Sequence, residues 1–82
     1  MLEFHGFNTV QLERVGERVF MLGKHQTAKD IYAVWEKGET FRMTAYICDD
    51  ERKAMAELQR RVDEAEAALK SRIAEIKERI AI

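Results

Sequence analysis

The C-terminal part of the chain carries apolar residues at alternating steps of three and four positions. Residues 49–82 contain neither glycine nor proline and are rich in alanine, glutamate, lysine, arginine and leucine, which are strong helix formers. Acidic residues at 49–51 suit the positive end of a helix, and Lys77 and Arg79 suit its negative end. The pattern predicts one long amphipathic helix over 49–82. Its apolar face comprises Met55, Leu58, Val62, Ala65, Leu69, Ile73, Ile76 and Ile80.

Residues 30–48 show a different pattern, in which β-branched and aromatic residues alternate on both sides of Gly38. This pattern predicts a β-hairpin. A three-residue loop over 36–38, with Gly38 left-handed, sets Ala33 opposite Phe41 and sorts the side chains onto two faces. One face, expected to lie beneath the first half of the helix, comprises Ile31, Ala33, Trp35, Phe41, Met43, Ala45 and Ile47. The other, expected to be partly exposed, comprises Tyr32, Val34, Thr40, Arg42, Thr44 and Tyr46.

The segment 8–24 fits two secondary structures. As a hairpin turning at Val15 and Gly16, it pairs Val10 with Met21 and keeps the chemistry of each face consistent. As a helix, it has a capping box at its start and an apolar stripe that ends at a glycine. We favour the hairpin.

These elements predict an α+β protein with a single domain over 1–82, β-rich at 1–48 and helical at 49–82. The expected fold is a small antiparallel β-meander of two hairpins followed by one long C-terminal α-helix. The alternative is an α-β-β-α arrangement with an N-terminal helix at about 9–22.

The expected helix is longer than the expected sheet. A helix of about 32 residues is about 48 Å long, whereas strands of six or seven residues span about 20 to 23 Å. Unless the helix bends back at Lys70 and Ser71, its distal apolar residues need a second surface to cover them. We therefore expect a homodimer formed through the helix. The expected self-association residues are Val62, Ala65, Leu69, Ile73, Ile76 and Ile80.

The charge of the chain is balanced, with 14 lysine and arginine residues against 15 aspartate and glutamate residues. This balance offers no strong attraction to nucleic acid or to an anionic membrane. Cys48 is the only cysteine, which excludes an intramolecular disulfide and makes a reducing compartment the simpler expectation. The first seven residues lack the features of a secretory signal, and no apolar run is long enough to span a membrane. We expect a cytoplasmic protein.

Candidate catalytic groups are few. The chain has two histidines, one cysteine and one serine, and their spacing matches neither a metal site nor a nucleophile with its base. Glycine-rich phosphate-binding motifs are also missing from the sequence. We therefore expect a protein that is not an enzyme and that uses no metal, cofactor or small-molecule substrate.

The expected function is binding to other macromolecules. The first hypothesis is a protein–protein interaction module that regulates or inhibits a larger protein or complex, as accessory proteins of phages and mobile elements do. The alternative is a small nucleic-acid-binding regulator, winged or helix-turn-helix-like. The candidate partner-binding residues are Lys24, His25, Lys29, Tyr32, Arg42 and Tyr46.

Overall fold

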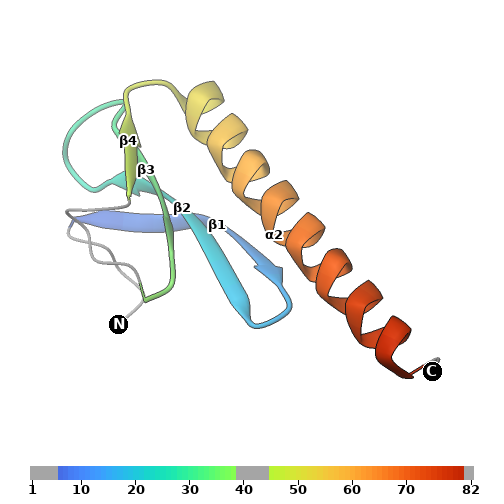
Figure 1. Ribbon diagram of the computed structural model, residues 1–82. Helices are drawn as coiled ribbons and strands as arrows, with labels where there is room; N and C mark the ends of the chain where they lie inside the picture. The colour runs from blue at the N-terminus through green and yellow to red at the C-terminus, as the bar shows by residue number, and fades with distance from the viewer. Residues whose placement is uncertain (1–5, 39–44, 81–82) are drawn as a thin grey trace.

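The protein contains a four-stranded antiparallel sheet and one long helix (Figure 1). The structure, a computed structural model, describes residues 6–38 and 45–80. The strands pair in chain order, so the sheet is a meander, and this confirms the predicted α+β fold rather than the alternative with an N-terminal helix. The elements are β1 (Phe7–Val15), β2 (Arg18–His25), β3 (Tyr32–Glu36), β4 (Tyr46–Cys48) and α2 (Glu51–Ile80).

The first hairpin turns through a two-residue loop, Gly16 and Glu17. Gly16 has a φ of 59° at the first central position, as a type II′ turn requires, and this turn suits the twist of paired strands. The predicted register was therefore wrong by two residues, because Leu12 and not Val10 lies opposite Met21. Val10 is left unpaired where a bulge interrupts the register of β1.

The second hairpin has a longer connection than the sequence pattern predicts. Ala33 lies opposite Ile47 rather than Phe41, so the predicted register was wrong here too. Phe41 belongs to 39–44, which is outside the described residues, as do Met43 and Arg42. The partner of Ala33 moves from position 41 to position 47, which is a shift of an even number of residues. Because side chains alternate between faces with a period of two, the described side chains keep the predicted sorting onto two faces. Gly38 has a φ of 95°, which confirms its predicted left-handed conformation.

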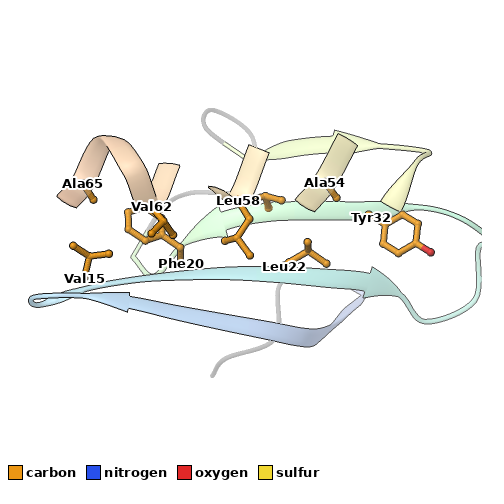
Figure 2. Packing of buried hydrophobic residues seen from close by; sticks show 9 residues of the cluster. Val15, Phe20, Leu22, Tyr32, Ala54, Leu58, Val62 and Ala65 are labelled. Atoms are coloured by element: carbon orange, nitrogen blue, oxygen red, sulfur yellow. The ribbon is translucent and has the colours of Figure 1, made fainter. Parts of the chain in front are cut away.

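The helix covers the face of the sheet opposite to the one predicted. Tyr32 and Val34 of β3 lie beneath α2, whereas Ala33 and Trp35 point to the other side. Figure 2 shows side chains of the helix and of the sheet pointing toward one another in this core. Its buried members are Val15, Phe20, Leu22, Tyr32, Val34, Ala54, Leu58, Val62 and Ala65.

The opposite face of the sheet carries a second buried cluster. Met21 and Trp35 are only 1% and 4% exposed there. The indole of Trp35 lies so close to Gly23 that a Cβ at that position would be 2.6 Å from Cη2 of the indole. The indole of Trp35 thus packs across Gly23 of the neighbouring strand β2. Its buried members are Phe7, Val19, Met21, Ala33 and Trp35, with Ile31 and Ala45 packed against them.

The start of α2 is capped and lies close to the sheet. The Asp50 carboxylate accepts a hydrogen bond of 2.8 Å from the backbone N–H of Arg52, which satisfies a free donor of the first turn. Ala54 is fully buried, whereas Met55 is 43% exposed, so the prediction that Met55 covers the sheet was wrong. The small side chains of Ala54 and Ala65 let the helix backbone approach the strands.

The distal half of α2 extends beyond the sheet as one continuous helix (Figure 1). Ala65 is its last buried residue, and the side chains of 66–80 are all exposed. The molecule is accordingly elongated, with extents of 57 × 25 × 20 Å. The predicted length mismatch is confirmed, and the alternative of a bend at Lys70 and Ser71 is not observed. Over the residues that the structure describes, no helix is apolar enough along its length to cross a membrane.

Candidate interaction surface

Four large aliphatic side chains form an exposed row along the distal half of α2. Leu69, Ile73, Ile76 and Ile80, here called the distal stripe, are 39%, 43%, 46% and 78% exposed. Their spacing of four, three and four residues places them on one side of the helix. No part of the described sheet lies against them in the way that it covers the first half of the helix.

The structure divides the self-association surface that the sequence predicts. Val62 and Ala65 are 8% and 3% exposed and belong to the core between the helix and the sheet. They are therefore not available to a partner in this conformation. The other four predicted residues make up the distal stripe, so only the distal part of the predicted surface can be contacted from outside.

A groove lies beside the distal stripe, between α2 and the turn that joins β1 to β2. Leu69 lies beside this turn, since its Cδ2 is 3.7 Å from the position that a Cβ on Gly16 would take. The sequence alone did not point to this groove, because the two segments that form it are about 50 residues apart. The lining residues are Val15, Gly16, Glu17, Arg18, Ala65, Ala68, Leu69, Arg72, Ile73 and Ile76.

Ion pairs hold the neighbourhood of this groove in place. Arg18 donates two hydrogen bonds to the Glu36 carboxylate, at 2.9 and 2.7 Å, and so joins β2 to β3. These hydrogen bonds lower the pKa of Glu36, while its partial burial opposes them and the charge of Arg61 on the helix assists them. Arg61 itself donates to Glu57 at 2.8 Å. The turn, β3 and the middle of the helix are thus linked by charge on this side of the sheet.

Two predicted partner-binding residues, Tyr32 and Tyr46, lie on the helix side of the sheet. Tyr32 is only 7% exposed and donates a hydrogen bond of 3.4 Å to Glu51 at the start of α2. Its burial, followed by the nearby Glu51 carboxylate, raises the pKa of Tyr32. Tyr46 is half-buried and packs against the same core. The face that we expected to be partly open is therefore the face that the helix covers, and Arg42 lies outside the described residues.

His25 has a structural role in the loop between β2 and β3. Its Nδ1 accepts hydrogen bonds from the backbone N–H groups of Thr27, at 3.2 Å, and Ala28, at 2.9 Å. Its ring also packs edge-to-face on Phe7, with 5.1 Å between the centroids. The two lysines of this predicted cluster, Lys24 and Lys29, are exposed. Binding of nucleic acid through these residues stays a prediction.

The described residues place few reactive groups together. Cys48 is half-buried, and its thiol donates to the backbone carbonyl of Asp50 at 3.3 Å. Within 6–38 and 45–80, no three histidine, cysteine, aspartate or glutamate side chains are grouped as a metal site requires. Exposed apolar side chains are instead gathered along the distal stripe and its groove.

Comparisons with protein-family models, with curated proteins and with solved structures find no match to this chain.

Proposed function

We propose that this protein is a protein–protein interaction module that binds through the distal stripe and the groove beside it. One observation carries the proposal. Four large aliphatic side chains, between 39% and 78% exposed, lie on one side of α2 in the half of the helix that extends beyond the sheet. Contiguous exposed apolar surface of this kind is typical of sites that contact another protein. Occupation of a partner's surface by the projecting helix would then regulate or inhibit that partner.

The area of the stripe limits how much binding free energy it can supply by itself. Full burial of one such side chain is worth about 1.5 to 3 kcal/mol, so covering four half-exposed ones contributes about 3 to 6 kcal/mol. Loss of translational and rotational freedom alone costs about 4 to 15 kcal/mol on association. The stripe by itself is therefore too small for tight binding. A partner would also have to fill the groove against the β1–β2 turn and pair with charges at its rim.

A single substitution in the stripe tests this proposal. Ile73→Lys places a charge in the middle of the stripe, while Ala74→Lys adds the same charge at an exposed position on the opposite side of the helix. Both variants should retain the helix, which circular dichroism at 222 nm would verify. Proteins of the source cell captured by the wild type and by Ala74→Lys should be lost by Ile73→Lys, as read by quantitative mass spectrometry.

Sedimentation equilibrium on the same three proteins covers the case in which the partner is a second copy of this chain. A dimer in the wild type and in Ala74→Lys that becomes a monomer in Ile73→Lys would support binding through the stripe. If all three proteins capture the same set and have the same mass in solution, the stripe is not a binding surface and the proposal fails.

A further inference from the structure

The distal stripe is bordered by positively charged side chains on both sides. Each of Lys70, Arg72, Lys77 and Arg79 is exposed and stands three or four residues from a member of the stripe. At 3.6 residues per turn, these four lie at about 70 to 90° from the centre of the stripe, with one lysine pair on one side and one arginine pair on the other. The stripe is thus an apolar strip between two basic rims.

The acidic residues of the distal helix are placed elsewhere. Glu75 and Glu78 lie at about 130 to 170° from the centre of the stripe and so face away from it. Glu66 borders Leu69 only at the end nearest to the sheet. From Leu69 to Ile80, the helix's own charges next to the stripe are therefore all positive, and Glu17 of the β1–β2 turn is the acidic residue that lines the groove beside it.

This arrangement opposes pairing of the stripe with an identical stripe. When two helices pack through such apolar rows, the residues that border each row face those of the other helix. In a parallel pair, Arg72 would face Lys77 of the second copy, and in an antiparallel pair lysines and arginines would again face cations. Like charges at these positions destabilise the pair, whereas opposite charges stabilise it and select the partner.

We propose that the occupant of the distal stripe is an acidic amphipathic helix of another protein. Its apolar side chains would pack on the stripe, and glutamates or aspartates at its borders would pair with the four cations. Residues 66–80 offer about 22 Å of helix, which matches a partner helix of about 15 residues. The inference rests on the proposed function and adds to it the chemistry of the partner.

Two synthetic peptides of about three heptads test the inference. Both carry leucine and isoleucine at the apolar positions, and they differ only in having glutamate or lysine at the bordering positions. Binding of the fluorescently labelled peptides to the full chain is followed by anisotropy. The glutamate peptide should bind about tenfold more tightly, the factor that four exposed ion pairs of ordinary strength supply. The preference should shrink as salt is raised from about 50 to about 500 mM.

Charge reversal on the protein provides the matched control. The double variant Lys70→Glu, Arg72→Glu reverses one cation on each rim and should abolish or invert the preference. The double variant Arg52→Glu, Lys53→Glu makes the same change in net charge at exposed positions on the first turn of α2 and should keep it. The helix content of each variant is checked by circular dichroism.

Three results would overturn the inference. The first is equal or no binding of the two peptides. The second is a homodimer in sedimentation that the glutamate peptide does not dissociate, which would make a second copy the occupant. The third is tighter binding to phosphatidylglycerol vesicles than to the glutamate peptide, which would assign the basic rims to a membrane surface. In the first case, loss of partner capture in Ile73→Lys would still support the proposed function. In the second case, loss of dimerisation in Ile73→Lys would do so.

Discussion

Substitution of Gly23 by alanine should destabilise the sheet by direct collision with Trp35. A Cβ at Gly23 would lie 2.6 Å from Cη2 and 2.7 Å from Cζ3 of the indole, and 3.1 Å from the backbone carbonyl oxygen of Asn8. Both distances to the indole are shorter than real Cβ contacts. Gly23 is not among the glycines with positive φ, so the expected effect is steric and does not arise from backbone strain.

The size of the expected destabilisation follows from the surroundings of the Trp35 indole and of the Asn8 carbonyl, which the new methyl group would meet. Forcing an extra methyl group into a packed site costs about 1 to 3 kcal/mol. The indole is 4% exposed and packed among Val19, Met21 and Ala33, so it has little room to retreat. The Asn8 contact involves backbone, which moves less easily than a side chain. We therefore expect about 2 to 3 kcal/mol, out of roughly 4 to 12 kcal/mol for a chain of this length.

A double-mutant cycle measures the collision itself. Trp35→Phe replaces the indole by a smaller ring that lacks the two atoms nearest to the new methyl group. In the Trp35→Phe background, Gly23→Ala should cost at least about 1 kcal/mol less than in the wild type. Urea unfolding followed by circular dichroism at 222 nm is the suitable assay, because Trp35 is the only tryptophan and its fluorescence changes in the cycle.

Gly38→Ala is the control for this cycle. Among the described residues, none lies within 4 Å of the position that a Cβ at Gly38 would take, but the φ of 95° strains an alanine there. Gly38→Ala should therefore lower the free energy of unfolding by the same amount whether position 35 holds tryptophan or phenylalanine. Two results would contradict this reasoning. The first is a loss of less than about 0.5 kcal/mol in the free energy of unfolding of Gly23→Ala. The second is a loss in the double variant that equals the sum of the losses in Gly23→Ala and Trp35→Phe within about 0.5 kcal/mol.

Three further predictions concern the core, the ion pair and the loop. Leu58→Ala should lower the free energy of unfolding, measured by urea titration, by about 2 to 5 kcal/mol, because this side chain of α2 is 2% exposed in the core between helix and sheet. A smaller loss would mean that the core closes around the cavity. The pKa of Glu36 is lowered by Arg18, so this carboxylate stabilises the fold above its unfolded pKa of about 4.5 and loses that contribution as pH falls through its folded pKa. Glu36→Gln should therefore lose less stability between neutral pH and pH ~3 than the wild type does, and equal losses would contradict this assignment. His25→Phe keeps the aromatic packing but removes the acceptor, so the backbone amides that it binds in the loop 26–31 should exchange faster with deuterium while those of β2 are unchanged.

By itself the sequence determined the long helix and the hairpin pattern around Gly38, but it left residues 8–24 open between a hairpin and a helix. The helix predicted over 49–82 is observed at Glu51–Ile80, because its propensities, its period and its cap all act within a few residues of one another. The choice between a helix and a hairpin at 8–24 was instead made by strand pairing, whereas the left-handed conformation of Gly38 is again a local feature. Local signals are sufficient for the helix and for Gly38, since each can be satisfied without knowledge of the rest of the chain.

The register of β3 with β4 and the covered face were decided only by the tertiary structure. Both faces of the sheet are apolar enough to be buried, so the alternation that sorted Tyr32 from Ala33 could not say which face the helix would take. A tyrosine fits beneath the helix because its hydroxyl reaches Glu51 at the helix start, which no period in the sequence reveals. The length of the connection between β3 and β4, and with it their register, likewise depended on pairing that the local pattern did not reveal, whereas the β1–β2 register follows from the two-residue turn at Gly16 and Glu17.

The candidate surface combines both kinds of information. The helix was long enough for an uncovered apolar stripe to be expected from length and period alone, and four of its six predicted residues are exposed. Where the stripe begins was settled by the sheet, which buries Val62 and Ala65 and ends beside Leu69. The groove exists only because the turn at Gly16 folds back onto the helix. A periodic pattern shows which side of a helix is apolar, but only packing decides how much of that side the protein itself covers.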